Sequence, residues 1–126
     1  MDQAKIKAAR EAIKAERQRQ LDVEGWTPEH DDRHDDGSLL RAAVFYFQHG
    51  ARKDFPLHYE KDGAPTGWPW DAKWWKPKTP RRDLERAGAL AMAERDRLRR
   101  LHRRTEPALH KLRLIINALA ELPDAA

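Results

Sequence analysis

The feature that most constrains this fold is the spacing of its apolar residues, which recur at steps of three and four along three separate segments. Such spacing places apolar side chains on one face of an α-helix. It predicts helices over 2–23, 80–102 and 105–122, each with one face in a shared core. A fourth segment, 39–49, is apolar nearly all round, which is typical of a helix at the centre of a fold.

Capping residues and glycine set the predicted helix ends. Thr79 and Pro80 supply the N-cap residue and the first-turn proline that begin a helix. Ser38 is predicted to cap the central helix, and Gly50 to end it. The charged block before Ser38, residues 29–36 (EHDDRHDD), is predicted to be a loop.

Residues 51–78 cannot form one long helix, because four prolines interrupt them. They also contain four of the five tryptophans, so we expect them to pack over the helices rather than to form a disordered linker. Lys61-Asp62-Gly63 predicts a turn that joins two short strands. The predicted fold is therefore mainly α: one domain over 1–126, a compact bundle of about four helices with an irregular Trp- and Pro-rich insertion between the second and third.

The composition of the chain indicates in which cellular compartment the protein is expected. The chain has no cysteine, which excludes disulfides and thiolate chemistry. Its N-terminus, MDQAKIKAAR, lacks the apolar run of a signal peptide, and no stretch approaches the roughly 20 apolar residues of a membrane span. We therefore expect a cytoplasmic protein with no membrane partner. Its oligomeric state stays open, a homo-oligomer included.

An acidic, histidine-rich block and two acids on apolar helix faces give the first candidate site. Carboxylates suit Mg²⁺ or Mn²⁺, and imidazole also suits Mn²⁺. Glu16 and Glu94 interrupt apolar stripes, and burying a lone carboxylate costs several kcal/mol unless it is paired or binds a cation. The predicted metal ligands are Glu29, His30, Asp31, Asp32, His34 and Glu94, with Glu16 and Asp83 behind them.

Three structural alternatives stay open for these acids. In the first, the block 29–36 is a solvated loop that caps the following helix. In the second, Glu16 and Glu94 form ion pairs with Arg17, Arg41 or Arg86. In the third, the apolar stripes are misplaced by one residue, which would leave both acids at the edge of the core.

Aromatic and basic segments give two further candidates. Tryptophans flanked by lysines can stack a base and hold a phosphate, although they can also cap a small core. Trp70 and Trp74 are the predicted stacking residues. The basic run 95–104 predicts nucleic-acid contacts, but its charge is spread over several helix faces, which favours a solvated surface. Its predicted contact residues are Arg97, Arg100, Arg103 and Arg104.

The pattern ERQRQ…EGWTPEHDDRHDDGSL…AAVFY, followed by WPWDAKWWKP and RRDLERAGALAMAERDRL, resembles a family of small phage and prophage proteins that has no assigned activity. The match covers most of residues 15–100 and implies an accessory protein of a mobile element. The order of an ER-x-RQ helix, a tryptophan turn with His and Asp, and a late charged helix is similar to MazG-type all-α NTP pyrophosphohydrolases. In those, EExxE and ExxD helices hold magnesium. Here LLRAAVFYFQHG has no acid, and Asp83, Glu85 and Glu94 do not form ExxD.

These observations predict a phage or prophage accessory protein that binds a small polar or phosphorylated, nucleotide-like ligand at the acid and histidine site, with Mg²⁺ or Mn²⁺. If the protein is an enzyme, the cation would polarise a phosphate and activate water, as in a metal-dependent nucleotide phosphohydrolase. One alternative is a non-enzymatic anti-defence protein or host-factor inhibitor that acts by protein–protein binding. Another is a nucleic-acid binder that uses the basic helix 95–104.

Overall fold

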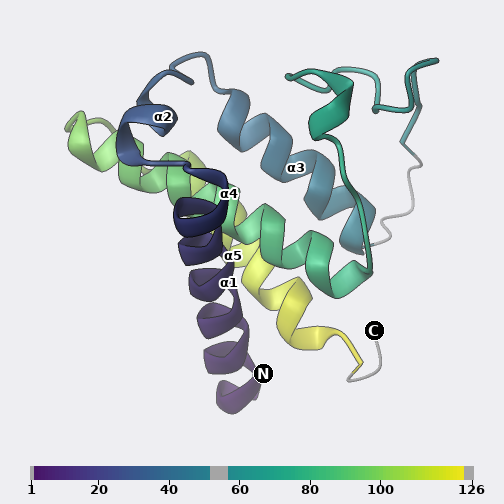
Figure 1. Cartoon of the computed structure of the whole chain (residues 1–126). Helices are drawn as coiled ribbons and strands as arrows, with labels where there is room; N and C mark the ends of the chain where they lie inside the picture. Colours follow the sequence, from purple (N-terminus) through teal and green to yellow (C-terminus); the bar gives the residue numbers. More distant parts are fainter. Residues whose placement is uncertain (1, 52–56, 124–126) are drawn as a thin grey trace.

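The computed structural model describes residues 2–51 and 57–123, and these form a mainly α-helical bundle (Figure 1). The predicted fold class is therefore confirmed. In the described part of the chain the only extended pairing is an isolated antiparallel bridge between Tyr59 and Pro65. No described helix is long and apolar enough to cross a membrane. The elements are α1 (Gln3–Glu24), α2 (Pro28–Asp32), α3 (Ser38–Ala51), the 3-10 helix η1 (Ala72–Trp74), α4 (Pro80–Arg100) and α5 (Glu106–Glu121).

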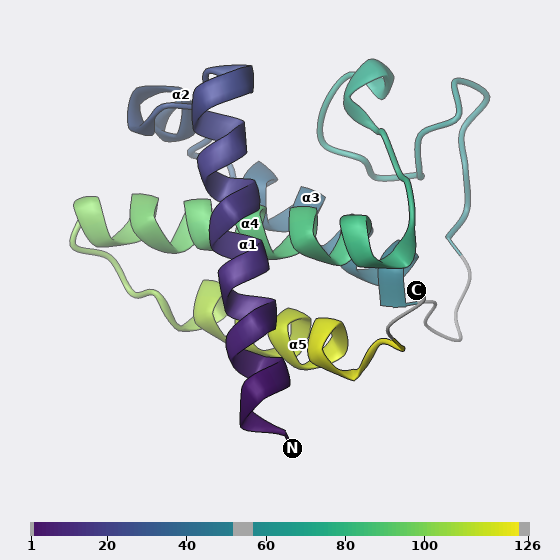
Figure 2. The ribbon, with the colours of Figure 1, turned by 60° about the horizontal axis from the view of Figure 1, so that its bottom comes forward.

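Helix α4 is the centre of the bundle, because it contacts each of the other four α-helices. Figure 2 shows α1 crossing α4 on one side, with α3 on the opposite side and α5 alongside. Apolar residues at helical spacing meet at these crossings, as their sequence pattern predicts. The largest fully buried aliphatic side chains of the helices come from α1, α3, α4 and α5: Ile13, Leu39, Leu84, Leu90 and Ile115.

Two glycines allow close packing of helices: Gly88 where α1 crosses α4, and Gly50 where α3 meets the start of α4. A Cβ atom on Gly88 would lie 2.5 Å from Cδ1 of Ile13, so α1 crosses α4 over this residue. A Cβ on Gly50 would lie 3.0 Å from the carbonyl oxygen of Pro80 at the start of α4. Gly50 was expected to end its helix, but α3 continues to Ala51. Its role is close packing.

The segment before α3 is more ordered than a loop. Thr27 and Pro28 repeat the start signal of α4: the Thr27 hydroxyl accepts the backbone N–H of His30 at 3.2 Å, and Pro28 is in the first turn of α2. Residues 28–32 are therefore helical, and only 33–37 remain irregular before α3. Ser38 is the first residue of α3 rather than its cap, and the Asp36 carboxylate accepts its backbone N–H at 3.0 Å.

The described part of the insertion, 57–78, lies against α3. Tyr46 of α3 is the anchor: its hydroxyl donates to the carbonyl of Trp74 at 3.2 Å and accepts the backbone N–H of Lys76 at 2.9 Å. The predicted turn at 61–63 is present, with Gly63 at φ 91°. The two predicted strands reduce to the single bridge on either side of it. Residues 52–56 lie outside the described part.

Candidate ligand-binding groove

Glu16 is buried as its place in the apolar stripe predicts, at 2% exposed. Arg19 forms two hydrogen bonds to its carboxylate, both 2.9 Å, and Nη2 of Arg82 donates a third at 2.8 Å. Burial acts to raise the pKa of Glu16, but the hydrogen bonds and charges of the two arginines outweigh it, so the pKa lies below its usual 4.5. Glu16 thus joins α1 to α4.

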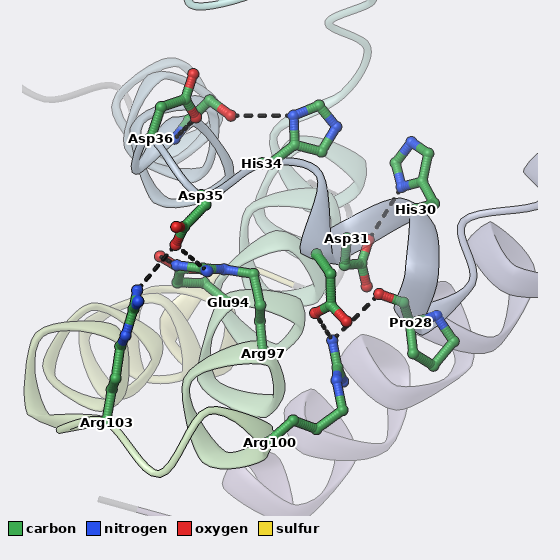
Figure 3. Close-up of polar contacts among 12 residues, drawn as sticks. Pro28, His30, Asp31, His34, Asp35, Asp36, Glu94, Arg97, Arg100 and Arg103 are labelled. Carbon is green, nitrogen blue, oxygen red and sulfur yellow. Dashed lines mark hydrogen bonds and ion pairs between the residues drawn. The ribbon is translucent and has the colours of Figure 1, made fainter.

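Glu94, 5% exposed, has the same arrangement on α4. Arg97 donates to it through Nε at 2.6 Å and Nη2 at 3.2 Å, and its Nη1 donates to Asp35 at 2.6 Å. Arg103 adds a 2.9 Å bond to Asp35 (Figure 3). These hydrogen bonds hold the pKa of Asp35 below its usual value.

The other predicted ligands are also engaged, each in a different place. Asp31 is fully buried and accepts hydrogen bonds from Arg17 and from Nδ1 of His30. Asp32 is bonded to Arg100 at 2.7 Å. Asp83 is held at the start of α4 by Nδ1 of His49 at 2.6 Å and the backbone N–H of Lys78 at 2.7 Å. Glu29 is exposed on α2.

The eight predicted metal ligands therefore do not form one site. In the described residues no three His, Asp or Glu side chains lie close enough together to hold a metal ion. As arranged, their oxygens do not fit a cation, because arginines, histidines or backbone N–H groups already bond to the buried carboxylates. The ion-pair alternative holds for Glu16 and Glu94, but the predicted partners were wrong: Arg17 pairs with Asp31, Arg86 donates to the Lys76 carbonyl and Arg41 is exposed.

All four arginines predicted to contact nucleic acid form ion pairs with carboxylates of the fold. Arg97 is buried at 3% exposed, and Arg100 and Arg103 bond to the segment before α3. Arg104 is exposed beside Glu106 at 3.4 Å. Much of the positive charge of this run is therefore balanced within the molecule.

The tryptophans gather at an open groove with a volume of about 440 Å³. Its walls come from the end of α1, from α2 and the turn after it, and from the insertion around η1. Two carboxylates, Glu24 and Asp71, lie on its border. The aromatic wall residues are Trp26, His30, His34, Trp70 and Trp74.

Four of these rings contact one another in a closed circuit. Trp26 and His30 are stacked, with centroids 5.4 Å apart and planes 3° apart. His30 contacts His34 at 5.1 Å, His34 contacts Trp70 at 5.2 Å, and Trp70 returns to Trp26 at 6.4 Å. Each ring is oriented by two neighbours, which makes this wall a preformed surface for a flat ligand.

Trp74 differs from the other four, because 43% of it is exposed and no other aromatic ring packs on it among the described residues. The ammonium groups of Lys73 and Lys76 lie 5.5 and 5.3 Å from its ring centroid. Cations at this distance are attracted by the face of an indole ring. Positive charge is therefore placed beside the exposed tryptophan.

The His34 imidazole in the groove wall is uncharged at neutral pH. Burial lowers the pKa of His34 below 6.5, and the neighbouring His30 lowers it further. Its Nδ1 atom lies 3.2 Å from the hydroxyl of Ser38, which fixes the ring against α3.

Behind the groove lies a smaller recess of about 30 Å³, bordered by Gln20 and sharing Glu24, Trp26, Trp70 and Trp74 with the groove. Two buried polar atoms here have no hydrogen-bond partner: Oε1 of Gln20 and Nε1 of Trp70. A buried polar group without a partner costs about 1–3 kcal/mol. In the described residues these are the only such side-chain atoms, and both border the same recess.

The structure thus brings Trp70 and Trp74 together with His30 and His34, and Glu16 borders the adjoining recess, whereas Glu94 and Asp83 line neither space. Gln20 and Trp26 were not among the site residues predicted from the sequence. Gln20 had a signal, because it is a polar residue on the apolar face of α1. Comparisons with known protein families, with curated proteins and with solved structures found no match for this chain.

Proposed function

We propose that this protein binds a small ligand with a flat heteroaromatic ring, such as the base of a nucleoside or nucleotide, in the aromatic groove. The observation that carries the proposal is an open space of about 440 Å³ with walls of three tryptophans and two histidines. Stacking on an aromatic side chain stabilises a bound base by about 1–3 kcal/mol. The role proposed is binding, without a cation and without a chemical step.

The two lysines beside Trp74 support a phosphorylated ligand as well. Lys73 and Lys76 lie beside the exposed ring of Trp74, where a phosphate on a stacked base would meet them. Exposed charges of this kind are screened by salt. The setting of the proposal, the cytoplasm of a bacterial host that carries a phage or prophage, comes from the sequence resemblance.

Intrinsic fluorescence tests the proposal directly, because three of the five tryptophans line the groove. We expect nucleosides and nucleoside monophosphates to quench the emission saturably. Trp74→Ala should weaken binding on the order of tenfold. It should change stability little, because the ring is 43% exposed. Tyr59→Ala, which removes an exposed ring outside the groove, is the matched control.

Salt separates the two parts of the ligand. Raising the salt concentration from low to moderate should remove the extra affinity of a monophosphate over its nucleoside and leave the nucleoside affinity nearly unchanged. If no nucleoside or nucleotide quenches the wild-type protein, the proposal is wrong.

Exposed apolar side chains near the groove favour a second candidate, a protein-binding inhibitor. Val23, in the last turn of α1, is 71% exposed, and Leu21 is 38% exposed. An aromatic anchor surrounded by apolar groups is typical of a protein-binding hot spot. The test is capture from bacterial lysate: one partner retained by the wild type and lost by both Val23→Asp and Trp74→Ala would identify this face.

A further inference from the structure

We infer that the ligand directs an amide- or amidine-type edge, one hydrogen-bond donor beside one acceptor, into the recess, where Gln20 and Trp70 bind it. The inference rests on the proposed function and names the class of ring that the groove selects. Its basis is the pair of buried polar atoms without partners at the inner end of the groove.

Gln20 is unusual for a polar residue at this depth. It is 2% exposed, and none of its side-chain atoms forms a hydrogen bond in the fold. The other buried polar side chains of α1 and α4, such as Glu16 and Asp83, are all bonded. A buried amide that the fold does not use is available to a ligand.

Trp70 shows the same feature by comparison with its neighbour. Trp68 belongs to the same cluster, with ring centroids 5.6 Å apart, and its Nε1 donates to the carbonyl of Asp71 at 3.2 Å. The Nε1 of Trp70 is buried and has no acceptor. The insertion thus satisfies one indole N–H and leaves the other at the recess.

The sizes of the two spaces determine how a ligand fits. The groove of about 440 Å³ accommodates a ring system, whereas the recess of about 30 Å³ admits only a group the size of a water molecule. A ring stacked in the groove therefore reaches the recess only with its edge and an exocyclic amino or oxo group.

The donor and acceptor inventory fixes the polarity of that edge. Indole N–H is a donor only, so the ligand atom that faces Trp70 must be an acceptor. The Gln20 amide carries both a carbonyl and an NH₂ group, and its oxygen requires a donor. Adjacent donors and acceptors of this kind occur on the amidine edge of adenine and on the amide edges of the other common bases. A ring without them would leave both protein atoms unpaired.

The experiment combines two side-chain deletions with matching deletions in the ligand. Gln20→Leu removes the amide at similar volume, and Trp70→Phe keeps an aromatic ring but removes the N–H. Gln18→Leu, on the exposed face of the same helix, is the control. The ligands are adenosine, guanosine, cytidine and uridine, with purine riboside and 2-pyrimidinone riboside, which lack the exocyclic group at C6 and C4.

For wild type and Gln18→Leu we expect the preferred nucleoside to bind on the order of tenfold more tightly than the analogue without the exocyclic group. In Gln20→Leu that preference should fall to within about twofold, while the analogue itself binds as it does to the wild type. Trp70→Phe should reduce the preference for guanosine or uridine, whose exocyclic oxo group accepts from Nε1. For adenosine or cytidine it should weaken nucleoside and analogue alike, because both keep the ring-nitrogen acceptor. The free Gln20→Leu protein should melt at the same or a higher temperature, because an unpaired buried amide is removed.

The outcomes separate the two claims. If wild type binds nucleosides but neither variant changes the preference, the edge contact is wrong and the groove proposal stands. A lower melting temperature for free Gln20→Leu would also overturn the inference, because it would give the amide a structural role. If wild type binds none of the six ligands, the proposed function itself fails.

Discussion

The segment 30–36 lies between two regions. Polar and charged side chains are paired within the fold in one region, and they line an open groove in the other. On one side, three of its aspartates bond to arginines of α1, of α4 and of the turn after α4. We call the set Asp35, Glu94, Arg97 and Arg103 the arginine clamp. On the other side, His30 and His34 form part of the groove wall. Figure 3 shows both histidines pointing away from the clamp arginines.

The difference between the two regions shows how to distinguish structural polar groups from binding groups. In the clamp every buried charge meets an opposite charge, so the region has little to gain from a ligand. At the groove the rings are preformed and two buried polar atoms lack partners. Unpaired polar groups beside an open volume indicate a binding site more strongly than the density of charge does.

The largest expected effect comes from breaking the clamp. Arg97→Ala leaves the Glu94 carboxylate buried without its partner, and we expect a loss of about 3–5 kcal/mol in the free energy of unfolding. Urea denaturation followed by circular dichroism measures it. Ligand binding by the folded fraction should be unchanged.

The double variant Glu94→Leu with Arg97→Met is the control for Arg97→Ala. It removes both charges at similar volume, so most of the lost stability should return. A loss below about 1 kcal/mol for Arg97→Ala would show that Glu94 is solvated, and the contrast between clamp and groove would no longer hold.

The paired acids were more predictable from the sequence than we expected. Glu16 and Glu94 each have an arginine three residues later, Arg19 in ERQR and Arg97 in ERDR, and side chains at that spacing are neighbours on a helix. Burial followed from the apolar stripe, and the partner follows from this repeat. The predicted partners failed because they ignored it.

The start of α2 was equally predictable from the sequence. Thr27-Pro28 repeats the pair Thr79-Pro80 that correctly placed α4, yet the acidic run that follows was expected to be a loop. The dense charge obscured a capping signal that local rules contain. Asp31 is buried at the centre of that run because Arg17 balances it across the α1–α2 contact.

The groove could not be predicted from local patterns. Trp26 and Trp70 are far apart in sequence and meet only through packing of the insertion beside α2. Aromatic content predicted that the insertion packs somewhere, without giving the partner or the side. That the side-chain oxygen of Gln20 has no hydrogen-bond partner is likewise a property of the tertiary environment.

A pH titration distinguishes the two regions by where stability is lost. The unfolded chain protonates His34 near pH 6.5, whereas burial in the groove wall keeps the folded histidine neutral to a lower pH. His34 should therefore cost no stability above pH 6.5, and the free energy of unfolding should decrease as the pH falls below that value. Glu16 contributes a second decrease below pH 4.5, because its folded pKa is lowered.

His34→Asn should remove the first decrease and leave the second. His110→Asn, at an exposed position of α5, is the control and should retain both. Urea denaturation at intervals from pH 8 down to about pH 2 resolves the two limbs. A His34→Asn curve that matches the wild-type curve down to pH 5 would place the histidine in solvent rather than in the groove wall.

The smallest effect concerns how the helix ends beside the two regions are built. Both α1 and α4 end in a left-handed residue: Gly25, at φ 70°, precedes groove residue Trp26, and His102, at φ 55°, precedes clamp residue Arg103. The backbone N–H groups of His102 and Arg103 bond to the carbonyls of Arg99 and Leu98, a Schellman arrangement that favours glycine at the position of His102.

His102→Gly should therefore stabilise the protein. Release of the left-handed strain is worth about 1–2 kcal/mol. Glycine's greater freedom in the unfolded chain offsets about 0.5–1 kcal/mol of that, so the net gain should lie between about 0 and 1.5 kcal/mol. Gly25→Ala is the reverse change, with nothing within 4 Å of the added Cβ, and should lose a similar amount. Thermal unfolding of both variants measures the two changes in stability.

Nucleoside affinity then tests the comparison between clamp and groove. If the clamp is structural only, His102→Gly gains stability with nucleoside affinity unchanged, whereas Gly25→Ala, beside Trp26, weakens binding as well. Equal effects on affinity would mean that the clamp and the groove act as one site.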